Sequence, residues 1–184
     1  MMPKPCADQI SNRNFLSPVG FKFTIAKNSK VTFFCNTAKI PRITLGTETF
    51  SNYLKDLDIP GDKISYEDLT IKFIVDEDLE NYMAVHNWIT GLGFPESAQQ
   101  YKSLTTNEDG TRDPNEAYSD GSLYVLNSNF NTNFIVKFKD LYPIDLTPLD
   151  FDSTATDIQY FTAEVTFKYT IYSILDKNNK PYGS

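Results

Sequence analysis

The sequence predicts a mainly β domain, an antiparallel sandwich or barrel that carries one α-helix and a long extended β-arm. Most of the chain alternates between apolar and polar residues with a period of two, which is typical of strands with one buried face. One stretch, from about 76 to 91, has helical spacing instead. A segment of about thirty residues, 39–68, shows neither period.

The alternating segments predict the strands. FKFTI (21–25) and VTFFC (31–35) flank a short polar KNSK stretch and predict a hairpin. LTIKFIV (69–75) and NFIVKFKD (133–140) alternate in the same way. The clearest segment, FTAEVTFKYTI (161–171), predicts one continuous strand with its odd-numbered residues in the core. Its polar face consists of Thr162, Glu164, Thr166, Lys168 and Thr170.

The segment VDEDLENYMAVHNWI (75–89) joins a group of carboxylates to the chain's single histidine and single tryptophan. On a helix that turns ~100° per residue, His86 lies near the middle of an apolar arc and Glu80 lies ~120° away. Carboxylates at a helix entry accept hydrogen bonds from free N–H groups and complement the positive end of the helix dipole. We therefore interpret Asp76 and Asp78 as helix caps, and not as an acid–base or metal site.

No other grouping of residues predicts chemistry. A zinc site needs three or four converging ligands, and only Cys6 and Cys35 remain to complete one around His86. The chain has no G-x-G-x-x-G, no P-loop lysine and no G-x-S-x-G motif. We expect no catalytic residues, no bound metal and no cofactor.

Two segments do not fit a compact body. We interpret residues 42–62 as an extended arm, because a structureless loop of that length is unusual unless it has a function. Pro60-Gly61 suits a type II turn within it. Residues 97–122 predict a polar, acidic, solvated loop. The arm's exposed apolar members are expected to contact another subunit: Phe50, Tyr53, Leu54, Leu57 and Ile59.

Charge and composition narrow the classes of protein. With 184 residues, 40% of them hydrophobic, the chain is long enough for one domain with a core. A net charge of −7 argues against a protein that grips nucleic acid. The sequence has no ~20-residue apolar run that would span a membrane and no signal-peptide-like run, so we expect a protein kept in a cytosol-like compartment.

Three segments carry a resemblance to a known family. They are FKFTIAKNSKVTFFCNTAKIP, IPGDKISYEDLTIKFIVDEDLENYMAVHNWI and KFKDLYPIDLTPLDFDSTATDIQYFTAEVTFKYTIYSI. Their order and spacing resemble those of the inner tail tube proteins of contractile-tailed bacteriophages of the T-even type. The resemblance covers residues 15–175, and it leaves an N-terminal arm (1–14) and a C-terminal tail (176–184) outside.

The resemblance implies a structural protein of the virion, made in the host cytoplasm. Six copies would form a ring whose sheets join into one barrel, and the rings would stack into an inner tail tube inside a contractile sheath. The implied partners are further copies of the chain, the sheath protein, baseplate or neck proteins, and DNA that passes without specific binding. The arm 42–62 would contact a neighbouring subunit, and the polar face of 161–171 would line the lumen.

Two alternatives stay open on the sequence. Within the same family, the chain could form the paralogous ring that starts the tube on the baseplate. In another class, it could be a monomeric β-sandwich binding module, with loop 97–122 as its site and Tyr101 and Tyr118 as contacts. The lysines on polar strand positions would not suit a lumen if all faced inward, so we expect some to face elsewhere: Lys22, Lys72, Lys137, Lys139 and Lys168.

Overall fold

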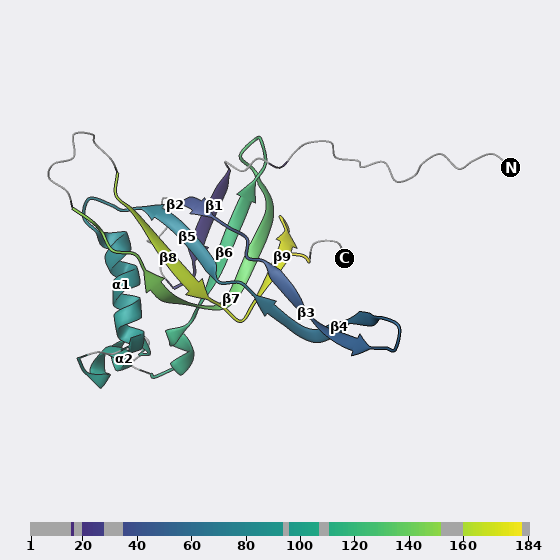
Figure 1. The fold of residues 1–184 in the computed structure, drawn as a ribbon. Coiled ribbons are helices and arrows are strands. Elements are labelled where there is room, and N and C mark those ends of the chain that lie inside the picture. The colour runs from purple at the N-terminus through teal and green to yellow at the C-terminus, as the bar shows by residue number, and fades with distance from the viewer. Residues whose placement is uncertain are drawn as a thin grey trace.

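The computed structural model describes residues 16, 20–27, 35–93, 96–106, 111–151 and 160–181 (Figure 1). Every paired strand is antiparallel, and the predicted mainly β class is confirmed. The strands are β1 (Phe21–Ile25), β2 (Cys35–Ala38), β3 (Ile43–Ser51), β4 (Asp56–Tyr66), β5 (Leu69–Ile74), β6 (Ser119–Leu126), β7 (Thr132–Leu146), β8 (Thr162–Lys168) and β9 (Ile171–Asp176). The helices are α1 (Glu80–Gly93), α2 (Ala98–Leu104) and the 3₁₀ turn η1 (Pro114–Ala117).

Strand β7 belongs to both layers of the fold. Its first part lies between β6 and β9, and its last part pairs with β8. One layer is therefore β1-β6-β7-β9 and the other is β2-β5-β8-β7. The strand bends at Asp140, which has φ 54° and coincides with a register shift against β6. An extra residue of this kind bends a strand and lets it pass from one layer to the other.

The core lies between the two layers. Phe23 of β1 and Phe167 of β8 meet across it with ring centroids 6.3 Å apart. Inward residues alternate along the strands as the sequence predicted. Those with no exposed surface include Leu69, Ile71, Phe73, Val136, Phe138, Ala163, Val165 and Phe167. Trp88 of α1 joins this cluster, with its ring 6.2 Å from that of Phe167.

The prediction of one continuous strand over 161–171 is wrong. Strand β8 ends at Lys168, and β9 starts at Ile171 and pairs with the other part of β7. Between them the N–H of Thr170 donates to the carbonyl of Lys139 at 3.0 Å. The break lies opposite the bend of β7, so a strand paired along β7 must turn there too. Thr170 is consequently at a corner and not on the polar face of β8.

The structure describes only part of the predicted hairpin between 21–25 and 31–35. Strand β1 pairs with β6, and β2 pairs with β5. Residues 28–34, which contain the turn and most of the predicted second strand, lie outside the described residues.

Helix α1 begins four residues later than predicted, because residues 76–79 form a turn. The N–H of Leu79 donates to the carbonyl of Asp76 at 3.0 Å, and Leu79 has φ 58°. Leu79 thus takes the position before the first helical residue, and Asp76 and Asp78 lie outside the cap position assigned to them. The buried Asn81 ties the helix to β5: its amide donates to the carbonyl of Ile74 at 2.9 Å and accepts from the N–H of Asp76 at 3.3 Å.

The predicted solvated loop 97–122 is largely ordered against α1. It contains α2, η1 and the start of β6. The indole N–H of Trp88 donates to the carbonyl of Ala117 at 2.9 Å, and Thr105 and Ala117 are buried. The sequence did not predict this ordered structure, because its contacts involve a backbone carbonyl and small side chains, which add little to a hydrophobic pattern.

Replacing Asn81 by Ala tests the link between α1 and β5. The change leaves the carbonyl of Ile74 and the N–H of Asp76 without their partner, so we expect a loss of about 1–3 kcal/mol in the free energy of unfolding. Urea denaturation measures it. Asn87→Ala, an exposed asparagine of the same helix, is the matched control and should change stability by less than about 0.5 kcal/mol. Equal effects of the two changes would contradict the role given to Asn81.

Candidate assembly surfaces

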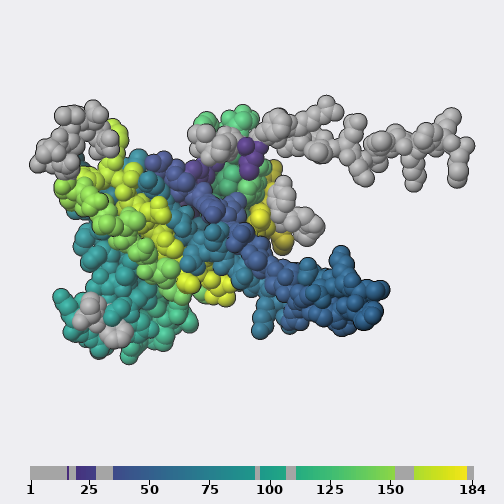
Figure 2. All heavy atoms as spheres, in the orientation of Figure 1, coloured from purple at the N-terminus to yellow at the C-terminus, as the bar shows by residue number. Residues whose placement is uncertain are grey.

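A two-stranded arm, β3–β4 (Ile43–Tyr66), stands away from the body of the molecule (Figure 2). It confirms an extended arm over most of the predicted 42–62, but the arm continues to Tyr66 and is a paired hairpin. Its turn lies at 52–55, and Pro60-Gly61 is inside β4. At that point the register shifts, and a Cβ on Gly61 would lie 2.8 Å from the carbonyl oxygen of Gly46. Only glycine permits this close approach of the two strands.

The outer half of the arm has an apolar face and a polar face. Phe50 lies opposite Leu57, and Ile59 lies two residues further along the same face. On the other face, the hydroxyl of Thr49 donates to the carboxylate of Asp58 at 3.3 Å. The structure thus brings Phe50, Leu57 and Ile59 together, and all three are exposed.

The remaining two predicted contact residues form the tip. Tyr53 is 98% exposed and Leu54 is 88% exposed. Isolated apolar residues on a surface are ordinary, but an apolar strip on a projecting hairpin marks an interaction surface. Sequence reasoning missed three further exposed apolar residues of the inner half, Ile43, Leu45 and Ile64. The apolar–polar alternation in ITL (43–45) and KIS (63–65) could have predicted them, but each run is only three residues long and lies close to a glycine.

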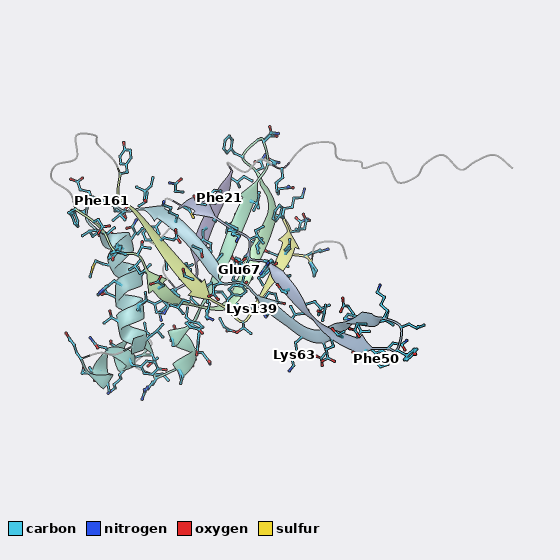
Figure 3. All side chains as sticks on the ribbon, in the orientation of Figure 1. Phe21, Phe50, Lys63, Glu67, Lys139 and Phe161 are labelled. Atoms are coloured by element: carbon cyan, nitrogen blue, oxygen red, sulfur yellow. The ribbon has the colours of Figure 1, made fainter. Side chains whose placement is uncertain are left out.

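The base of the arm is held by Glu67, which follows β4 where the arm meets the body (Figure 3). Its carboxylate accepts from the backbone N–H of Arg42 at 3.4 Å and pairs with the ammonium of Lys39 at 3.3 Å. Its own N–H donates to the carbonyl of Arg42 at 3.0 Å. The backbone hydrogen bond from Arg42 and then the contact with Lys39 lower the pKa of Glu67 below its ordinary value of 4.5.

A second candidate surface is the outward face of β5 and β8. Lys72 lies opposite Glu164, and Thr70 lies opposite Thr166. Thr166 also lies opposite Asp145 of β7. Four of the five residues predicted for this polar face share it: Thr162, Glu164, Thr166 and Lys168. The ammonium of Lys168 is 3.6 Å from the carboxylate of Asp68, so its charge is compensated locally.

The polar-strand lysines are divided between the two layers. Lys72 and Lys168 belong to the β2-β5-β8-β7 layer, whereas Lys22, Lys137 and Lys139 belong to the β1-β6-β7-β9 layer. On that second layer Lys137 lies 3.4 Å from Asp120. No single face therefore collects all five positive charges.

The β2-β5-β8-β7 layer has two open edges among the described residues. Strand β2 pairs only with β5, and residues 142–146 of β7 pair only with β8. Next to the β7 edge lies a groove of about 270 Å³ between α1 and β7. His86 is exposed on this groove beside Asp145, and not packed within an apolar core.

The described residues contain one histidine, His86, and one cysteine, Cys35. They contain no group of three or more His, Cys, Asp and Glu side chains that could hold a metal ion. Burial raises the pKa of the Cys35 thiol to about 12, which favours the thiol over the nucleophilic thiolate; Cys6 lies outside the described residues. Within the described part of the chain, no helix is both long and apolar enough to cross a bilayer.

The two tyrosines of the alternative binding module have different aromatic and cationic neighbours. Tyr101 of α2 lies 5.8 Å from the guanidinium of Arg112, while the ring of Tyr118 packs edge-on against Tyr142 at 5.6 Å. A groove of about 380 Å³ does exist beside α2, but neither tyrosine lines it.

Known proteins resemble this chain in sequence and in fold. A family model described as phage tail tube protein matches residues 4–175. The tail tube terminator protein of Enterobacteria phage T4 is 25% identical over 122 residues, which span 66% of this chain and 62% of the T4 protein, less than two thirds of its length.

Two solved structures share the fold. The tube terminating cap of the anti-feeding prophage has a TM-score of 0.57 and 15% identity, covering 93% of this chain and 97% of that one. A chain of the sheath–tube complex of the extracellular contractile injection system PVC, in its extended state, has a TM-score of 0.55 and 14% identity, covering 94% and 99%.

The depressed pKa of Glu67 predicts how the arm base responds to acid. Because the folded pKa lies below the unfolded one, the stabilisation is complete above pH 4.5 and is lost as the pH falls through the folded value. We expect the protection factor of the Glu67 amide, corrected for intrinsic exchange, to decrease in that acid range. In Glu67→Gln the acid-dependent decrease should be absent. A wild-type protection factor that is constant below pH 4.5 would contradict this prediction.

Proposed function

The chain belongs to the phage tail tube protein family, and we propose that it forms a closed ring that ends the inner tube of a contractile phage tail. The ring would contain six copies, as the resemblance to inner tail tube proteins implies. The observation that carries the proposal is the pair of edges on the β2-β5-β8-β7 layer that are open among the described residues, together with an arm that has an exposed apolar face.

In this ring the β2 edge of one subunit meets the 142–146 edge of the next. Unpaired N–H and C=O groups on both edges then find partners, and the exposed edges that promote aggregation disappear. Such a contact is heterologous, with different patches on its two sides, and it closes only if the rotation between subunits divides a full turn. The polar face of β5 and β8 would then line a channel.

The proposed channel wall suits DNA that passes without specific binding. Thr70, Thr162 and Thr166 are small and uncharged. The two positive charges of Lys72 and Lys168 are outnumbered by the three carboxylates of Glu164, Asp68 and Asp145. Because non-specific DNA binding depends on uncompensated Lys and Arg, this wall would hold phosphates weakly.

The arm would bind a neighbouring subunit, either in the same ring or in the next ring. Burying Phe50, Leu57 and Ile59 in such a contact would remove the apolar strip from water. The sheath protein and proteins of the neck or baseplate are further proposed partners, and the protein would reside in the virion tail. The role is structural, without catalysis.

Similarity to the named relatives supports the proposed position in the tail. Similarity to the T4 tail tube terminator favours a ring that stops the tube. The second candidate is a bulk tube subunit, favoured by the similar fold in the PVC sheath–tube complex. A bulk tube subunit would form rings that stack on one another, whereas a terminator ring would not.

Native mass spectrometry and negative-stain imaging of the purified chain test the proposal. A terminator should give rings of six that do not grow into rods, and should shorten the rods of the tube protein from the same phage. Rods formed by the chain alone would support the bulk tube subunit instead. A chain that is monomeric at all concentrations, alone and with the tube protein, would reject both.

Changing Phe50 to Lys tests the arm contact. A lysine in the apolar face should abolish binding of the arm to its partner while the subunit stays folded, because Phe50 lies outside the core. Thr49→Lys places the same charge on the opposite face, beside Asp58, and should assemble normally. Sedimentation velocity measures the assembled fraction. Assembly of Phe50→Lys at the wild-type level would show that this face is not a contact.

A further inference from the structure

We propose that three tyrosines, Tyr66, Tyr169 and Tyr172, fix the direction in which the arm leaves the body. We call these three residues the tyrosine clamp. The clamp acts within one subunit, so the arm is already aimed before any partner binds. Its consequence for assembly rests on the proposed ring, but the clamp itself does not.

The rings of the clamp join the arm to the core. Tyr66, the last residue of β4, packs against Tyr172 at 5.6 Å and against Tyr169 at 6.1 Å. Tyr169 and Tyr172 flank the corner between β8 and β9 and lie 6.1 Å from each other. Both also contact Phe138, at 5.1 and 5.7 Å, and Phe138 has no exposed surface. Tilted and edge-to-face aromatic pairs have preferred geometries, so this packing favours one orientation of the arm base.

The hydroxyls of the clamp hold the two legs of the arm separately. The hydroxyl of Tyr172 donates to the carbonyl of Pro41, just before β3, at 3.2 Å. The hydroxyl of Tyr169 donates to the carbonyl of Glu67, just after β4, at 2.8 Å. Rotation of the arm about its base must break at least one of these two bonds.

In the part of the chain that the structure describes, the strands of the arm contribute little to its direction. From Ile43 to Ser65 every residue except the half-buried Gly61 is exposed, so the strands of the arm are not packed into the body. The hydroxyl of Tyr169 is a donor at physiological pH, as in any tyrosine of ordinary pKa, and burial, with a smaller effect of neighbouring groups, raises its pKa further, to about 12. A rigidly aimed arm loses less conformational entropy on assembly than a free one.

A distance measurement within the subunit tests the clamp. Spin labels are placed at the arm tip and on α1 (Tyr53→Cys and Asn87→Cys) in a Cys6→Ser, Cys35→Ser chain, and labelled subunits are diluted with unlabelled ones. The parent should give one narrow distance. Tyr169→Phe with Tyr172→Phe keeps the rings and removes both hydroxyls, and it should broaden the distribution. Hydrogen exchange at the arm base should quicken by about two- to tenfold for each hydroxyl lost.

The matched control is Tyr124→Phe on β6, because that hydroxyl makes no hydrogen bond to any residue that the structure describes and lies outside the proposed contacts. It should leave both the distance distribution and the exchange rates at their parent values. Unchanged values in the double phenylalanine variant would show that the hydroxyls do not hold the arm. Unchanged values also in Tyr169→Ala with Tyr172→Ala would overturn the clamp altogether. None of these outcomes depends on ring formation, so they are distinguishable from failure of the proposed function.

Discussion

The open edges of the β2-β5-β8-β7 layer are the constraint on which the account of this molecule depends. Backbone N–H and C=O groups on a strand edge need partners, and the described part of the chain supplies none for the outer sides of β2 and of residues 142–146. Within the described residues these groups have no strand to pair with. Repetition of the subunit around an axis would satisfy them, and it would place the polar face of β5 and β8 on the inside of the resulting barrel.

The bend of β7 at Asp140 leaves one edge of the layer open, and it also lies opposite the corner whose tyrosines contact the base of the arm. Strand β7 leaves its first layer at Asp140, and the chain opposite it breaks between β8 and β9. Because β6 does not follow β7 around the bend, residues 142–146 are left with one partner strand. Tyr169 and Tyr172 sit at the broken corner and reach the legs of the arm. The edge and the arm, which are the two proposed assembly surfaces, therefore share one structural origin.

The alternation of apolar and polar residues along the sequence predicted the strands whose side chains point alternately into the core and out of it. Alternation located β5 and the buried residues Ala163, Val165 and Phe167 of β8, because successive side chains of a strand point to opposite faces and every second one is therefore buried. Exposure of Phe50 and its neighbours followed from the lack of any regular period around them. The polar face of β8 was also foreseen, apart from Thr170.

The failures came from contacts that leave no trace in the hydrophobic pattern. The corner after Lys168 depends on a bend in β7, about thirty residues away. Pro60-Gly61 resembles a turn locally, but the opposite glycine, Gly46, makes it a site of close strand approach. The helix start depended on Asn81, whose buried amide bonds to β5. In each case the deciding partner is distant in sequence or is a backbone group, and neither leaves a hydrophobic signal.

The most direct measurement is a cryo-electron microscopy map of the assembled particle at a resolution that separates strands. The account predicts a ring in which β2 of one subunit pairs with residues 142–146 of its neighbour and in which Thr166 faces the channel. A particle in which these two edges face solvent, or in which Thr166 lies on the outer wall, would contradict it.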